Sequence, residues 1–167
     1  MREPTPSTGA RIATSAAVGL IAGLAASFAM DRFQALTQPN SDDDGEPATE
    51  QAADGIARDL TGEPLADEDK PLGGQFVHYG LGTLLGIGYG IAAEFAPRVT
   101  TGMGTAFGTG TWAVLDEATV PAAGLGDPPS QAAPATQAYS LASHLVFGLV
   151  AEGARRGACA ALDSFRK

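Results

Sequence analysis

The sequence predicts an all-α fold, a polytopic membrane protein built as a four-helix transmembrane bundle with glycine-rich helix interfaces. Three observations predict it. The 167-residue chain contains four long runs without Asp, Glu, Lys or Arg, each run carries small or polar residues at every fourth position, and 11 of the 19 acidic residues fall between Asp42 and Asp69. A hydrocarbon slab about 30 Å thick needs roughly 20 apolar residues in a helix, so each run is a candidate span of one membrane domain.

The first candidate span covers residues 12–33 and contains the uncharged run from Ile12 to Met30. An alternative interpretation is a signal peptide, because Arg2 and Arg11 lie near its start and "SFA" has the small residues of a cleavage site. Three further spans would still follow in that case.

Residues 38–74 are predicted to form an acidic extracytoplasmic linker, because they are rich in Asp, Glu, Gly and Pro and therefore well solvated. Within it, "EPATEQAADGIARDLTG" predicts a short amphipathic helix with Ala52, Ile56 and Leu60 on one face. Such a helix can lie on a membrane surface; a loosely ordered segment is the alternative. An acid-rich, lysine-poor exterior is also typical of proteins from high-salt organisms.

The remaining spans are predicted over residues 76–96, 99–118 and 139–158, and they overlap uncharged runs of 23, 17 and 24 residues, respectively. The run at Val99–Leu115 is the shortest and is rich in threonine. A soluble Gly/Ala-rich helical domain is the alternative, since the mean hydropathy is only +0.03. Soluble helices, however, alternate charged and apolar faces, and these four runs have no charged face.

Small residues recur at every fourth position in each span, and each row ends at a carboxylate. Apolar burial does not hold helices together in lipid, so close backbone contact at small residues replaces it. The rows predict eight helix-packing glycines: Gly19, Gly23, Gly82, Gly86, Gly90, Gly104, Gly108 and Gly148. They also suggest two pseudo-repeated hairpins; the alternative is that all glycine-rich helices look alike.

The basic residues predict the orientation. With four spans, seven of the ten Lys and Arg residues share one side with both termini, and only Arg32, Arg58 and Lys70 lie on the other. Both termini are therefore predicted to be cytoplasmic in the plasma or inner membrane, with the acidic linker outside.

Seven titratable residues are the candidate polar or proton-relay groups, because a charge at membrane depth is costly and usually pairs, faces a cavity or serves a function. They are His144, Glu152, His78, Glu94, Asp116, Glu117 and Asp31. We expect His144 and Glu152 to lie deepest. The alternatives are interfacial placement for the residues near span ends, and simple neutralisation of Glu152 by Arg156 four residues later.

Several classes of function are not indicated. The net charge of −9 leaves no basic face for nucleic acid. The single cysteine, Cys159, cannot form an internal disulfide, and no Cys/His cluster has zinc spacing. No phosphate-binding loop or nucleophile elbow is present. We therefore predict no cofactor, no metal and no enzyme activity, and an intramembrane enzyme is the least favoured class.

Three segments, "VHYGLGTLLGIGYGIAAE", "GTGTWAVLDEATVPAAGL" and "SHLVFGLVAEGARR", resemble the YagU-like family of small integral membrane proteins. The matched positions include His78, Tyr79, Tyr89, Glu94, Asp116, Glu117, Pro121, His144, Glu152 and Arg155, whereas Phe147 stands where tyrosine is expected. The resemblance implies a membrane protein of unknown activity associated with acid resistance.

Two hypotheses of function follow. The first is a proton- or acid-responsive channel or transporter, a homo-oligomer in the lipid bilayer whose histidine and carboxylate layers form a polar path. The second is a non-transporting membrane scaffold or stress protein, in which the same groups only specify helix pairing.

Overall fold

The computed structural model describes residues 6–37 and 45–165, and every regular element in these ranges is helical. The all-α prediction is therefore confirmed. The elements are α1 (Thr8–Thr37), α2 (Ala48–Thr61), α3 (Lys70–Phe95), the 3₁₀ turn η1 (Pro97–Thr100), α4 (Thr105–Val114), the π-helical segment η2 (Leu115–Thr119), α5 (Val120–Ala122) and α6 (Pro134–Phe165).

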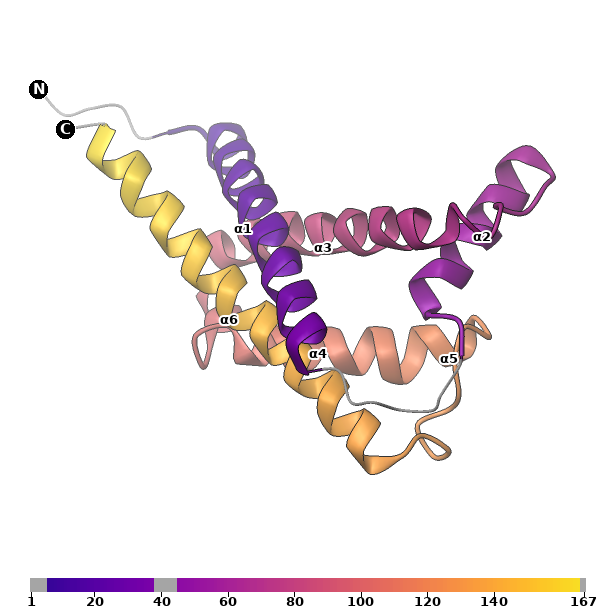
Figure 1. The fold of residues 1–167 in the computed structure, drawn as a ribbon. Helices are drawn as coiled ribbons and strands as arrows, with labels where there is room; N and C mark the ends of the chain where they lie inside the picture. Colours follow the sequence, from indigo (N-terminus) through magenta and orange to yellow (C-terminus); the bar gives the residue numbers. More distant parts are fainter. Residues whose placement is uncertain (1–5, 38–44, 166–167) are drawn as a thin grey trace, which may run out of the picture.

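Helix α1 is central, because it packs against both α3 and α6, while α4 packs against α6 and α2 packs against α3 (Figure 1). The start of α1, the end of α3 and the end of α6 lie together at one end of the molecule, where Arg11 pairs with Glu94 and Ala10 shares a cavity with Leu162. At the opposite end, Tyr139 at the start of α6 donates a hydrogen bond to the carbonyl of Gln34 near the end of α1.

Two of the described helices, α1 and α3, are long and apolar enough to cross a membrane, judged by length and composition. Helix α6 is longer than either, but Ser140, Ser143 and His144 lower the hydropathy of its first half. Helix α4 ends after ten residues, although η2 and α5 extend it without a break. The predicted spans 12–33 and 76–96 therefore correspond to the long apolar helices α1 and α3. Helix α1 extends beyond both ends of its predicted span, whereas α3 begins earlier than predicted and ends at Phe95.

The third predicted span, 99–118, is wrong at its start. Gly102, Met103 and Gly104 have positive φ values of 65°, 58° and 88°, a left-handed conformation that cannot continue a right-handed helix. The helix therefore begins at Thr105 and runs on to Ala122 through the π-helical segment. Pro121 explains that segment, because its ring would clash with the carbonyl four residues earlier in a regular α-helix.

The predicted linker 38–74 is shorter than expected, because α3 already begins at Lys70. Pro71 occupies the first turn of α3, where its missing N–H removes no helical hydrogen bond. The predicted helix within the linker is present as α2. Its buried residue is Ala53, which packs against α3, while Ile56 and Leu60 of the predicted apolar face stay exposed.

The glycines in the four-residue rows lie at close contacts between helices. A Cβ on Gly86 would come within 2.6 Å of the backbone nitrogen of Gly23, and a Cβ on Gly148 within 2.8 Å of that of Gly108. Gly88, which lies off the rows on α3, has no atom within 4 Å of the place its Cβ would take. All eight predicted packing glycines lie against another segment, namely Gly19, Gly23, Gly82, Gly86, Gly90, Gly104, Gly108 and Gly148.

The interior is made mostly of small residues, and most of the large apolar residues lie outside. Ala26 and Ala151 are fully buried in the helix contacts, and Tyr89 and Phe147 are the large side chains packed among them. By contrast Phe28 and Leu84, on the two long apolar helices, are 57% and 67% exposed. A water-soluble core would bury more of the large aliphatic and aromatic side chains.

Candidate functional site

The seven candidate residues do not form one path. Four of them, Asp31, His78, Asp116 and His144, line one cavity between α1, α2, α3, η2 and α6. Glu152 lies in a separate buried cluster, and Glu94 lines a second cavity at the other end of the molecule. Glu117, although adjacent to Asp116, lines neither cavity. The expected polar path of histidine and carboxylate layers is therefore divided among three places.

The larger cavity has a volume of about 620 Å³ and is called the outer cavity below. The first turn of α2 and the start of α3 form one wall, and α1, η2 and α6 form the others. This volume falls within the usual range for small-molecule sites, roughly 300–1,000 Å³. The linker helix therefore contributes directly to the wall of a site that holds both histidines of the chain.

His144 is the most buried titratable residue of the outer cavity, at 6% exposure. Its Nδ1 lies 3.0 Å from the Ser140 carbonyl oxygen and 3.6 Å from Asp116 Oδ2, and the Ser140 hydroxyl donates to the same carboxylate. A carbonyl oxygen only accepts, so this contact assigns the hydrogen to Nδ1. A protonated His144 would gain attraction to Asp116.

Asp116 lies within the π-helical segment, one residue after its start, and its carboxylate accepts a hydrogen bond from Ser140 of α6. Such segments are frequent at functional sites. The sequence indicates the two adjacent acids but not which of them faces the neighbouring helix.

His78 and Asp31 form the opposite side of the outer cavity. His78 Nε2 lies 3.2 Å from the carbonyl oxygen of Ser27 on α1, and the Tyr79 hydroxyl donates a long hydrogen bond of 3.5 Å to Asp31. Asp31 also pairs with Arg32 at 2.7 Å. Asp31 is therefore balanced by an arginine, whereas Asp116 lies beside the imidazole of His144, which carries a charge only when it is protonated.

Glu152 is fully buried and accepts hydrogen bonds from three side chains. Arg155 donates from Nε at 2.7 Å and from Nη2 at 2.9 Å, Arg156 donates from Nε at 2.6 Å, and the Tyr89 hydroxyl donates at 2.8 Å. Tyr89 in turn stacks on Phe107 of α4 with ring centroids 4.2 Å apart. The cluster therefore ties α3, α4 and α6 together, and its carboxylate has its charge and acceptor sites satisfied.

The Tyr89 hydroxyl provides a direct test of this cluster. Tyr89→Phe is expected to lower the free energy of unfolding by about 2 kcal/mol, because it leaves a buried carboxylate oxygen short of one donor. Chemical unfolding of the purified protein in detergent, followed by circular dichroism, measures the change. Tyr139→Phe removes a hydroxyl whose carbonyl acceptor lies near the end of α1, and a smaller loss is expected there; equal losses would contradict a special role for Tyr89.

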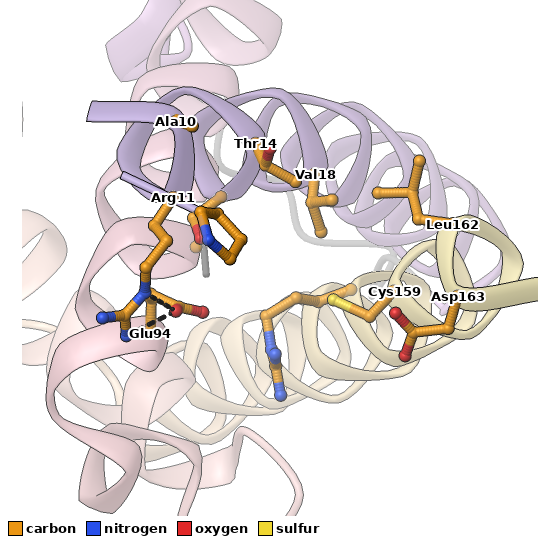
Figure 2. A pocket seen from close by; sticks show the side chains of 12 residues that line it. Ala10, Arg11, Thr14, Val18, Glu94, Cys159, Leu162 and Asp163 are labelled. Carbon is orange, nitrogen blue, oxygen red and sulfur yellow. Dashed lines mark hydrogen bonds and ion pairs between the residues drawn. The ribbon is translucent and has the colours of Figure 1, made fainter. Parts of the chain in front are cut away.

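Glu94 lies at the other end of the molecule, where its carboxylate pairs with Arg11 of α1 at 2.7 Å. Figure 2 shows this pair on one side of a cavity of about 370 Å³, with Cys159, Leu162 and Asp163 of α6 on the other side. Arg98 lies four residues after Glu94 in the sequence, but it follows the helix end and Pro97, and the ion-pair partner of Glu94 is Arg11. The long-range pairing fixes the start of α1 against the end of α3.

Sequence reasoning did not select Ser27, Glu50, Tyr89 or Ser140 as site residues, although all four contact the candidate groups or line the outer cavity. Ser27 and Ser140 belong to the rows of small or polar residues at every fourth position. Their place in these rows is the sequence signal that could have indicated them. Glu50 had none, because nothing in the acidic linker distinguishes it from its ten acidic neighbours.

No protein-family model, curated protein or solved structure matches this chain. The resemblance to the YagU-like family therefore stays a prediction, and the functional argument depends on the geometry of the site.

Proposed function

We propose that this chain is a multi-pass membrane protein with four membrane-crossing helical segments. The observation that carries the proposal is the distribution of side chains, with mostly Gly, Ala and Ser at the close helix contacts and many Leu, Ile and Phe side chains exposed on the outside. Only 33% and 28% of the most apolar windows of α1 and α3 are buried. A core helix of a soluble protein would be mostly buried, and an apolar exterior of this extent needs lipid or a partner to cover it.

The arrangement of helix ends supports a topology with both termini in the cytoplasm. The start of α1, the turn at η1 and the end of α6 would share the cytoplasmic side with Arg11, Arg98, Arg155 and Arg156. The linker helix α2 and the residues between α5 and α6 would lie outside. In this topology the spans are α1, α3, the continuous segment from α4 to α5, and α6, as two hairpins with glycine contacts inside each.

We propose further that the protein is a small proton-responsive channel or transporter, acting through the outer cavity. The support is the placement of both histidines and two of the aspartates on one cavity, with His144 beside Asp116. Histidine gains its proton in mild acid. Protonation of His144 would add a positive charge next to Asp116 in the π-helical segment η2. Acid would therefore change the electrostatic attraction between α6 and η2.

Reconstitution into liposomes tests this activity. With a pH-sensitive dye inside and outer pH values from 8 to 4, we expect proton flux that rises in acid, and His144→Ala is expected to reduce the flux roughly tenfold or more. Empty liposomes give the background.

Glu117→Gln is the matched control, because Glu117 lies beside Asp116 but lines neither cavity. It should leave the flux unchanged. Wild-type liposomes that show no flux above background, or His144→Ala flux equal to the wild type, would contradict the proposal.

The alternative is a non-transporting scaffold, and the Glu152 cluster favours it. Glu152 lines neither cavity and is neutralised by Arg155 and Arg156. A transport path would need a polar group of this depth to be available. If the protein is a scaffold, substitutions at Glu152 and at the histidines alter stability and nothing else. Homo-oligomer formation is predicted under both functions, because four thin helices enclose little volume.

A further inference from the structure

The outer cavity has an excess of negative charge. Three carboxylates line it from three different elements, Asp31 on α1, Glu50 on α2 and Asp116 on η2, and no lysine or arginine of the described residues lines it. Asp31 is balanced by Arg32. Glu50 and Asp116 have no lysine or arginine partner within the described ranges. Two carboxylates on facing walls are therefore available to a cation.

The rest of the wall is mostly apolar, with Leu81, Leu85 and Phe147 among its lining residues. Ser27 also lines the cavity, but its hydroxyl is fully buried against Gly82 in the contact between α1 and α3. The polar groups open to a ligand are therefore the carboxylates and the two histidines. An apolar cavity with a few convergent polar groups is the usual form of a small-molecule site.

The geometry does not suit a metal ion. No three of the His, Cys, Asp and Glu side chains in the described parts of the chain lie close enough together to hold one. A divalent metal needs several such ligands at about 2–2.6 Å. An organic ammonium group needs only one or two carboxylates, and its carbon body is stabilised by apolar walls.

We propose that the outer cavity binds a small organic cation, a protonated amine with an apolar body, between Asp116 and Glu50. This proposal rests on the proposed function, since it names the chemical class that competes with protons at the same cavity. Protonation of His78 and His144 would add positive charge facing Asp31, Glu50 and Asp116. The ammonium group therefore binds more weakly in acid, although the amine itself stays protonated between pH 5 and 8.

Equilibrium binding to the full chain in lipid nanodiscs tests the proposal, with empty nanodiscs subtracted. The probe is 2-phenylethylammonium, compared with 2-phenylethanol, which is neutral and similar in size. At pH 8 we expect the ammonium compound to bind at least tenfold more tightly than the alcohol, and to lose several-fold in affinity at pH 5. Equal binding of the two compounds, or no binding of either, would overturn the proposal.

Variants identify the carboxylates. Asp116→Asn and Glu50→Gln are each expected to weaken binding roughly tenfold, whereas Glu117→Gln and Glu63→Gln, whose side chains do not line the cavity, should bind like the wild type. Thermal unfolding confirms that each variant is folded, and the wild-type comparison of amine with alcohol does not depend on any variant. Binding that survives in both cavity variants would overturn the assignment to this cavity.

Nanodiscs carry no pH gradient, so the binding experiment does not depend on transport. The two experiments can therefore distinguish a failure of the ligand assignment from a failure of the proposed transport. Loss of amine selectivity with intact proton flux overturns only the ligand assignment, and selective binding without flux overturns only the proposed transport.

Discussion

Gly86→Leu is expected to separate α1 from α3 and to prevent the native bundle from forming. Gly86 lies against the backbone of α1, where a Cβ would come within 2.6 Å of the Gly23 nitrogen and cannot be accommodated by rotating a side chain. The helices must move apart, and every close contact along the same seam is lost with them. We expect a loss of about 3 kcal/mol or more in the free energy of unfolding.

Unfolding in detergent measures this loss, and cross-linking between cysteines placed on α1 and α3 reports whether the helices still touch. Gly88→Leu is the matched control, two residues away on the same helix, with no atom within 4 Å of its added Cβ. It should retain cross-linking and lose less than about 1 kcal/mol. Equal losses for the two variants would show that glycine contacts do not hold these helices.

Glu152→Gln is expected to produce the second large effect. The substitution keeps the shape of the side chain but removes the negative charge that Arg155 and Arg156 both contact. Arg155 is largely buried, so its guanidinium would be left without a counter-charge in a water-poor site. Removal of one partner from a buried ion pair typically costs about 3–5 kcal/mol, and the lower end applies because Arg156 is half exposed.

Glu94→Gln is the control for charge removal. Its pair with Arg11 is partly exposed on both sides, at 35% and 43%, and exposed ion pairs contribute about 1 kcal/mol or less. Denaturant unfolding of both variants should therefore give clearly different losses. A loss for Glu152→Gln no larger than that for Glu94→Gln would contradict the buried role of Glu152.

The helix contacts could be predicted from the sequence because they obey a local rule. A residue every fourth position stays near one side of a helix, so a row of glycines indicates where another backbone can approach. The glycines on the rows do lie against other segments, and Gly88, off the rows, does not. The same rule predicted neither the start of α4, which depends on three consecutive left-handed residues, nor the length of the linker.

The candidate site was less predictable, because its geometry depends on residues distant in the chain. His144 and Glu152 lie eight residues apart on one helix, yet one faces the outer cavity and the other the cluster with Tyr89. Asp116 and Glu117 are adjacent, and it is Asp116 that accepts a hydrogen bond from Ser140 of α6. Residue type and spacing do not contain this information.

The sequence alone determined that the chain is helical, which segments are free of charge and where backbones can approach closely, since periodicity and side-chain size are local properties. The tertiary structure alone decided which polar groups meet, namely Glu152 with two arginines and Tyr89, and Glu94 with Arg11, and that Glu50 and Asp116 line one cavity. The physical reason is that the partner of a buried charge is set by how the helices cross and where they end, and both depend on the whole bundle.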